Sequence, residues 1–308
     1  MEKYLRALLR RLGLIRIARR AWCELQARRR GICISSAADG FRVRRGADEI
    51  WIGRSHEVYL NDMIVFFDYY FGAVAPEQNG SARVADYSKP KVHRLRHSAV
   101  EFEFPALPDS DESTQMYLDA LQPKPGEVVF DLGAYAGGST YFFAKAVGAD
   151  GLVAAFEPDP ASLEFLRRNV SRHELANVMI FDCGIWSENT TLSFQSEGNM
   201  GSSVASILKR DSNVRQTRVI TLEEAARLAG GRAVSCIKMD IEGAEVAVLR
   251  SATEFLRSNR PRLIIEPHAV DGRMTTAEIT QILQGCGYRV EVLSQGSQDW
   301  PLVSAWPQ

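Results

Sequence analysis

The chain has 308 residues, of which 45% are hydrophobic and 24% are charged. These fractions are ordinary for a globular protein with a sizeable core, and we find no internal repeat or low-complexity tract. No apolar run reaches the roughly 18 residues that a membrane-spanning helix needs. The five cysteines lack CxxC spacing, which gives no support to a zinc site and favours reduced thiols.

The charge is unevenly distributed along the chain. Residues 1–30 carry ten Lys or Arg against two Glu, whereas the whole chain has a net charge of −1, so the remainder is acidic. An acidic body is a poor match for nucleic acid, and we expect no nucleic-acid partner. The basic segment predicts an amphipathic helix. This helix either packs on its own catalytic domain or docks on an anionic membrane or a partner protein, and RNA contact is the third alternative. Its apolar residues at helical spacing are Leu5, Leu8, Leu9, Leu12, Ile15, Trp22 and Leu25.

Residues 31–115 form a less regular region. Alternation over residues 41–52, broken by a Gly-Ala-Asp-Glu stretch, predicts a small hairpin. The aromatic run at 63–71 is long enough for one packed helix. The polar stretch at 109–113 is suited to cap a helix over 114–121. We therefore expect an N-terminal α+β extension packed on the core.

Residues 128–138, VVFDLGAYAGG, are the most informative stretch. The apolar run around Asp131 predicts a buried parallel strand, and the glycines after it predict a tight turn that opens a helix. A second strand at 152–156 ends in Glu157-Pro158. Nucleotide sites of βαβ units place the acid that binds ribose hydroxyls at this position, about 20 residues after the turn. The two elements together predict a nucleoside site.

The turn argues against two common nucleotide sites. The G-x-G-x-x-G fingerprint of NAD-binding proteins needs a glycine where Tyr135 stands, and this side chain would crowd a pyrophosphate. No GxxxxGK[ST] sequence is present, which excludes a P-loop. The pattern DLGxxxGG, with EP at the next strand, instead resembles the S-adenosylmethionine (SAM) site of class I methyltransferases, whose ligand carries no phosphate.

A third block, CIKMDIEGAE at 236–245, is more specific. It resembles the IKxDxEGxE signature of the FkbM family of SAM-dependent methyltransferases. The strand that ends in Glu266-Pro267-His268 resembles the next strand of that family, and TLEE at 221–224 resembles its TLDD segment with Glu at both acidic positions. The resemblance covers roughly residues 130–266. It implies SAM as cofactor and a hydroxyl oxygen of a sugar, polysaccharide or polyketide as the typical methyl acceptor.

After residue 127, predicted strands and helices alternate, which favours a doubly wound parallel sheet. The resemblance implies an α/β, Rossmann-like class I methyltransferase fold of seven strands with an antiparallel last strand. We expect a basic segment at 1–30, an extension at 31–115 and the methyltransferase domain at 116–308. Residues 183–234, with a strand at 191–194 and a Gly/Ser loop at 198–203, are typical of a lid or of a surface loop without a role. Strands are predicted near 128–132, 152–156, 178–182, 235–240, 262–266, 287–293 and 301–306, and helices near 138–147, 159–173, 243–257 and 275–285.

Ligands of open α/β sheets bind at the carboxyl ends of the strands, where five acidic residues of this chain fall. The resemblance implies that Glu157 accepts the ribose hydroxyls and that Asp131 orients the ammonium group of SAM. Asp182 would meet the adenine amino group, unless it is only a turn residue. The expected cofactor-binding residues are Asp131, Gly133, Tyr135, Gly137, Glu157, Pro158, Asp182 and Cys183.

A sugar hydroxyl is a weak acid, so methyl transfer to it needs a positioned base or a metal. Asp240 is the first candidate base, and Lys238 lies on the same face of its strand. His268 is the second, because imidazole titrates near neutral pH. Glu242 and Glu245 are as well explained as acids in the first turn of the next helix. A divalent metal on Asp240, Glu266 and His268 is an alternative that the spacing does not require, so no metal ligand is assigned.

These observations predict a SAM-dependent O-methyltransferase (EC 2.1.1.-) that modifies a sugar, a glycan or a glycosylated metabolite. Two alternatives stay open. One is a catalytically silent SAM-binding scaffold, and the other is an RNA or protein methyltransferase, although the N/D-P-P-Y motif of amino-group methylation is missing. Arginines interrupt each apolar stretch of the N-terminus, so we expect no signal peptide. The expected location is the cytoplasm, either free or with residues 1–30 docked on the inner membrane surface.

Overall fold

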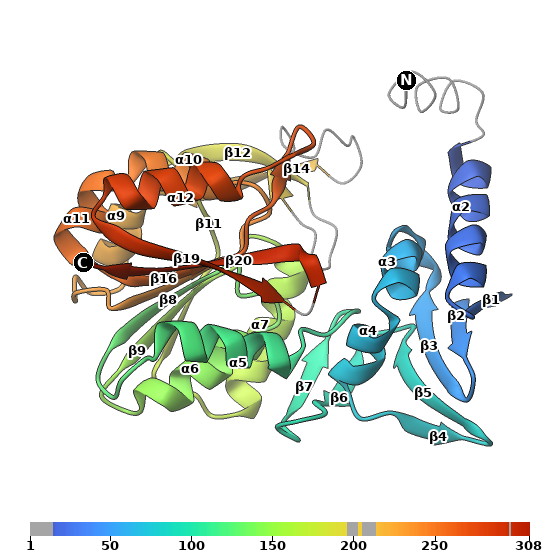
Figure 1. Ribbon diagram of the computed structural model, residues 1–308. Helices are drawn as coiled ribbons and strands as arrows, with labels where there is room; N and C mark the ends of the chain where they lie inside the picture. Colours follow the sequence, from blue (N-terminus) through green and yellow to red (C-terminus); the bar gives the residue numbers. More distant parts are fainter. Residues whose placement is uncertain (1–14, 196–202, 205–213, 296) are drawn as a thin grey trace. The chain divides into compact units, whose positions relative to one another are not determined.

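The computed structural model describes residues 15–195, 203–204, 214–295 and 297–308 (Figure 1). The chain divides into two compact units, Met1–Ser110 and Asp111–Gln308. Among the described helices, none is both long and apolar enough to span a bilayer. Most of the predicted Gly/Ser loop at 198–203 and the first half of the basic segment lie outside the described residues.

The first unit is built on a five-stranded sheet in the order β1-β2-β3-β5-β4. Its first three strands form an antiparallel meander, which confirms the predicted hairpin, and β5 pairs with β3 in parallel. The unit also contains the basic helix α2 (Ile15–Arg29), the hairpin β6–β7 and the short helices described below. The strands are β1 (Cys33–Ala37), β2 (Gly40–Arg45), β3 (Asp48–Gly53), β4 (Glu77–Asn79), β5 (Ala82–Tyr87), β6 (Lys91–Arg94) and β7 (Glu101–Phe104).

The aromatic run of this unit is divided between two helices. A 3-10 turn, η1 (Arg54–Tyr59), leads into α3 (Leu60–Val65), and α4 (Phe67–Ala73) follows after a break at Phe66, whose φ is −111° and ψ 38°. The prediction of one helix over 63–71 is therefore wrong. No glycine or proline marks the break, so the local sequence does not reveal it. The aromatic residues serve as core: Phe67, Tyr70 and Phe71 are buried.

The second unit contains a seven-stranded sheet in the order β10-β9-β8-β15-β16-β20-β19 (Figure 1). All neighbours from β10 to β16 pair in parallel, whereas β20 is antiparallel to both β16 and β19. This confirms the predicted seven-stranded α/β fold with an antiparallel last strand. The strands are β8 (Val128–Leu132), β9 (Leu152–Phe156), β10 (Val178–Phe181), β15 (Cys236–Met239), β16 (Arg262–Ile265), β19 (Tyr288–Gln295) and β20 (Ser297–Pro307).

Helices cover both faces of this sheet, which explains why its strands are apolar without alternation. All five residues of β8 are buried; Val129 packs toward Tyr117 and Phe143, whereas Phe130 belongs to the cluster on the opposite face. The helices on the first face include α5 (Asp111–Leu121), α6 (Gly138–Val147) and α7 (Pro160–Arg172). Those on the second include α9 (Leu222–Leu228), α10 (Glu245–Ser251), α11 (Thr253–Asn259) and α12 (Thr276–Gly285).

Two connections differ from the sequence prediction. The predicted helix over 243–257 is interrupted at Ala252 and becomes α10 and α11. The Ser251 hydroxyl donates a hydrogen bond to the Val248 carbonyl, a side-chain bond that competes with the helical ladder. The long connection after β10 contains a second sheet in the order β11-β14-β12-β13, of which only β12 was predicted. Its strands are β11 (Gly184–Ile185), β12 (Thr190–Gln195), β13 (Ser203–Val204) and β14 (Val214–Ile220).

Candidate active site

The glycine-rich turn leaves β8 at the carboxyl edge of the sheet and contacts the end of β15. Gly133 has φ +78°, and a Cβ on it would lie 1.8 Å from the Asp240 carbonyl oxygen. Only glycine fits both this backbone conformation and this close approach. Gly137, with φ +87°, precedes α6, and a Cβ there would meet the Leu166 side chain at 2.7 Å. The predicted nucleoside turn is therefore constrained by the residue that follows β15 and by the Leu166 side chain.

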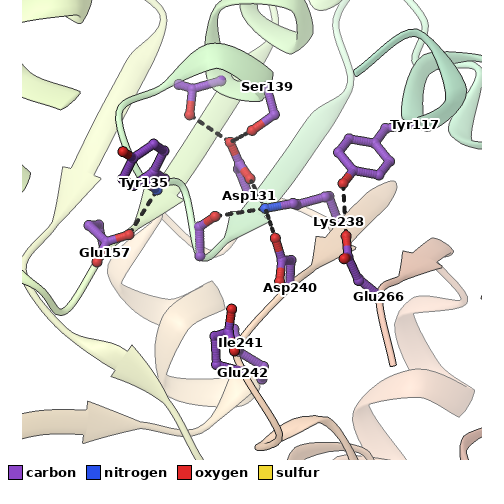
Figure 2. A network of polar contacts seen from close by, with 12 residues as sticks. Tyr117, Asp131, Tyr135, Ser139, Glu157, Lys238, Asp240, Ile241, Glu242 and Glu266 are labelled. Carbon is purple, nitrogen blue, oxygen red and sulfur yellow. Dashed lines mark hydrogen bonds and ion pairs between the residues drawn. The ribbon is translucent and has the colours of Figure 1, made fainter. Parts of the chain in front are cut away.

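Asp131 is completely buried near the end of β8, and one of its oxygens is held by the start of α6. Its Oδ2 accepts hydrogen bonds from Ser139 Oγ at 2.8 Å and Thr140 Oγ1 at 2.6 Å. Its Oδ1 is buried and accepts no hydrogen bond from any described residue, although Lys238 Nζ lies 3.5 Å away (Figure 2). The carboxylate is thus fixed with one acceptor oxygen still available.

Glu157 follows β9 directly and is 6% exposed. Its Oε2 accepts the backbone N–H of Tyr135 at 2.8 Å (Figure 2). Its Oε1 accepts the backbone N–H of Asp159, also at 2.8 Å. Burial raises the pKa of Glu157 to about 8, against the opposing effect of these two hydrogen bonds. Because each carboxylate oxygen can accept a second hydrogen bond, the side chain can still receive two hydroxyl groups.

Asp182 and Cys183 follow β10, and their side chains differ in exposure. Asp182 is exposed, whereas Cys183 is 2% exposed and packs in the hydrophobic cluster with Phe156 and Ile185. Burial raises the pKa of the Cys183 thiol to about 11, so the thiol is neutral near pH 7. Cys183 is suited to form an apolar surface but not to act as a nucleophile.

Lys238 joins the turn to the end of β15. Its Nζ donates a hydrogen bond to the Gly133 carbonyl oxygen at 2.7 Å. The same Nζ lies 3.5 Å from Asp131 Oδ1 and 3.6 Å from Asp240 Oδ2 (Figure 2). Its side chain is only 5% exposed. The sequence suggested that Lys238 and Asp240 share a face of their strand, and the structure shows in addition that Lys238 is a buried bridge between two carboxylates.

Asp240 and His268 meet two further acids at the same edge. His268 Nδ1 contacts Glu245 Oε1 at 2.9 Å, and its Nε2 lies 3.7 Å from Asp240 Oδ1 and 3.6 Å from Glu242 Oε1. Burial lowers the pKa of His268, but the carboxylates of Glu242, Glu245 and Asp240 outweigh this effect and raise it well above the usual value. Burial, with further contributions from Asp240 and Glu266, raises the pKa of Glu242 to about 8.

Glu245 and Glu266 occupy distinct places around this group. Of the two acids suggested for the first turn of the next helix, only Glu245 lies in α10, whereas Glu242 precedes it. Glu245 Oε1 accepts the Gly243 backbone N–H at 3.0 Å in addition to its contact with His268. Glu266 turns elsewhere, since its Oε2 accepts hydrogen bonds from Tyr117 Oη at 3.2 Å and Gln295 Nε2 at 3.3 Å. Among the described residues, the side chains close enough together to bind one metal ion are those of Asp240, Glu242 and His268. Glu242 thus takes the place of Glu266 in the ligand set that the sequence suggested.

Sequence reasoning missed four side chains of this site. Ser139 and Thr140 were seen only as a helix start, although two hydroxyls that follow a DLG turn are a readable signal. Tyr117 lies 149 residues from its partner Glu266, and Gln295 lies 29 residues away from it. No local pattern connects either of them with the site.

The match to a family model decides the identity of this unit. The model described as "Methyltransferase FkbM domain" matches residues 131–290, more than half of the chain. The chain belongs to the FkbM methyltransferase family. This confirms the resemblance inferred from its motifs, and the chain is a SAM-dependent methyltransferase of the FkbM type.

Two curated relatives resemble this FkbM methyltransferase. The 31-O-demethyl-FK506 methyltransferase FkbM of Streptomyces tacrolimicus is 25% identical over 200 residues, which cover 55% of this chain and 75% of the relative. Methyltransferase 1 of Beauveria bassiana (strain ARSEF 2860) is 26% identical over 160 residues, covering 46% of this chain and 64% of the relative.

Solved structures are similar at lower identity. A methyltransferase FkbM from Methylobacillus flagellatus KT is 18% identical, with a TM-score of 0.44 and coverage of 63% of this chain and 50% of that chain. A precorrin-6y C5,15-methyltransferase from Geobacter metallireducens GS-15 is 15% identical, with a TM-score of 0.44 and coverage of 65% and 90%.

The residues at the carboxyl edge fit SAM. Glu157 has acceptor capacity for two ribose hydroxyls, and the buried Oδ1 of Asp131 is a ready acceptor for an ammonium group. Of the other expected residues, Gly133, Tyr135 and Gly137 form the turn, and Pro158 follows Glu157. The individual roles of these residues, including the contact of Asp182 with adenine, stay predictions.

Proposed function

We propose that this FkbM methyltransferase transfers a methyl group to a hydroxyl oxygen of a sugar, a glycan or a glycosylated metabolite. The observation that carries the proposal is the position of Asp240. Its carboxylate is 30% exposed at the end of β15, and Lys238 connects it to the expected cofactor carboxylate Asp131. A proton acceptor that solvent and substrate can reach thus lies beside the expected SAM site.

Asp240 can take the proton that the acceptor hydroxyl loses as its oxygen forms the new bond to carbon. When bound, SAM supplies an electrophilic methyl group on a sulfonium whose departure needs no acid assistance. The chain therefore has to align the hydroxyl oxygen, exclude water and receive one proton. Alignment of this kind contributes roughly 7–11 kcal/mol to lowering a barrier. Lys238, 3.6 Å from Asp240 Oδ2, holds the carboxylate in position for this transfer.

The acidic residues at this edge favour a neutral acceptor rich in hydroxyl groups. Asp240 and Glu242 offer oxygens that can accept hydrogen bonds from hydroxyls. The same carboxylates disfavour an acceptor rich in phosphate, such as RNA. The printed name of the Streptomyces relative also describes methylation at an oxygen. These points support a hydroxyl oxygen over RNA as the acceptor.

Methyl transfer from SAM labelled with ¹³C in its methyl group tests the proposal. The full chain is incubated with neutral oligosaccharides and glycosylated metabolites, and with RNA and unfolded protein as competing acceptors. We expect an O-methyl NMR signal on a carbohydrate, its loss in Asp240→Asn, and its retention in the matched surface variant Glu278→Gln. Methylation of a nitrogen in RNA or protein would contradict the proposal. SAM binding without turnover on any acceptor would support the scaffold alternative instead.

A further inference from the structure

His268 is arranged as a ligand with one nitrogen anchored and the other directed into the site. The contact of Nδ1 with Glu245 Oε1 at 2.9 Å fixes the orientation of the ring. Nε2 lies 3.6 Å from Glu242 Oε1 and 3.7 Å from Asp240 Oδ1, beyond hydrogen-bonding distance of either oxygen. Histidines that bind metals characteristically give their second nitrogen to a carboxylate in this way.

One atom from each of three side chains lies close to where the ligands of a small cation would lie. The contributing atoms of Asp240, Glu242 and His268 all lie within 4.8 Å of one another. Metal–ligand bonds of about 2.1 Å place neighbouring ligands roughly 3.0 Å apart at octahedral angles and roughly 3.4 Å apart at tetrahedral angles. The separations at Nε2 of 3.6 and 3.7 Å are slightly longer, so a cation would have to draw these side chains a little closer together.

Glu245, which contacts His268, adds a second observation. Its side chain is 0% exposed, and its Oε2 is buried without a hydrogen-bond partner among the described residues. A buried carboxylate oxygen left in this condition is costly, so such atoms in proteins normally contact water or an ion. Carboxylates outnumber cationic groups around His268, and a dication would compensate them.

We propose that Asp240, Glu242 and His268 bind a divalent cation, with Glu245 as the positioning residue for His268. Two carboxylate oxygens and one imidazole nitrogen suit a first-row ion such as Mn²⁺, which accepts both donor types, better than Ca²⁺. Three protein ligands leave coordination positions open. Cation binding itself does not depend on the acceptor assignment, whereas the role of the ion in binding the acceptor hydroxyl rests on the proposed function. Asp240 Oδ2, on the Lys238 side, stays available to accept the hydroxyl proton.

Titration of the full chain with Mn²⁺, followed by the electron paramagnetic resonance signal of free Mn²⁺, tests this site without any acceptor. We expect one Mn²⁺ per chain in the wild type. Glu242→Gln and His268→Gln should each weaken binding at least tenfold, and Glu245→Gln should weaken it about 10- to 100-fold through the orientation of His268. Glu266→Gln, which changes a neighbouring carboxylate outside the set, should retain the ion.

Calorimetric measurement of SAM binding by each variant separates loss of the cation site from misfolding, because the residues expected to bind SAM are not among the proposed cation ligands. No stoichiometric Mn²⁺ binding by wild-type protein that binds SAM would overturn the cation site while leaving the proposed function intact. Binding that survives Glu242→Gln and His268→Gln but is lost in Glu266→Gln would overturn the assignment of ligands. Conversely, Mn²⁺ binding without methyl transfer would leave the cation site in place and contradict the proposed function.

Discussion

The ammonium group of Lys238 lies 3.6 Å from the carboxylate of Asp240 and is almost completely buried. The same ammonium is 3.5 Å from Asp131, whose Oδ1 accepts no hydrogen bond from the described residues. One cation therefore balances the carboxylate expected to hold the cofactor and the carboxylate expected to receive the proton. Through Lys238, a change at either acid affects the other.

Lys238→Met should destabilise the second unit, because it leaves Asp131 buried without its cation. Removal of one partner from a buried ion pair typically costs about 3–5 kcal/mol. Combining Lys238→Met with Asp131→Asn should recover part of this loss, with a coupling energy of about 0.5–3 kcal/mol. Hydrogen exchange at the amides of β8 measures the unfolding free energy of this unit. Additive effects in the double variant would show that the two side chains are not coupled.

Gly133→Ala should be far more damaging than Gly126→Ala, although the two glycines have similar φ angles of +78° and +82°. Both variants place an alanine in the left-handed region, at a cost of about 1–2 kcal/mol. Only at position 133 does the new Cβ overlap backbone, 1.8 Å from the Asp240 carbonyl oxygen, whereas nothing lies within 4 Å at position 126. Thermal unfolding of both variants measures the difference. Equal losses would show that the contact with Asp240 is not restrictive.

The cofactor edge was largely predictable from sequence because its signals are local. Asp131, Gly133 and Glu157 fall at strand ends set by uninterrupted apolar runs, and the confirmed strand order follows from alternating strands and helices. The ligand-like arrangement around His268 was not predictable to the same degree. It depends on which carboxylate lies next to the imidazole. Glu242, a loop residue with φ +54°, contacts His268, whereas Glu266 contacts Tyr117.

The helix breaks at Phe66 and Ala252 were also hidden. Apolar periodicity continues through both positions, so a pattern at helical spacing predicts one helix where the chain forms two. The small sheet that includes β11 and β14 escaped for a related reason. Strands of two residues such as β11 carry no periodicity, and β14 pairs with β12 and β11 across a long connection and not through a short hairpin turn.

His93 should make the first unit sensitive to acid. Its side chain is 6% exposed beside Tyr87 and Phe104, and burial, with Lys91 adding to it, lowers the pKa to about 4. Since the unfolded chain takes up this proton near pH 6.5, the contribution to stability is present above pH 6.5 and is lost as the pH falls toward 4. The difference in pKa corresponds to about 3 kcal/mol.

His93→Phe, which keeps an aromatic ring at this place, should remove most of that pH dependence. Hydrogen exchange of β5 and β7 at pH values between 4 and 7 measures it in the full chain. His97→Phe changes an exposed histidine of the same unit and serves as the control. An unchanged acid response in His93→Phe would show that other groups cause it.

Calorimetric titration of the full chain with SAM and S-adenosylhomocysteine tests the nucleoside site most directly. We expect both ligands to bind with one site per chain. Glu157→Ala should weaken binding about 10- to 100-fold, because it removes two hydrogen bonds that contribute about 0.5–1.5 kcal/mol each. Glu164→Ala, an exposed change on the neighbouring helix α7, should bind as the wild type does. Absence of binding by folded wild-type protein, or equal binding by Glu157→Ala, would contradict the site described at the carboxyl edge of the sheet.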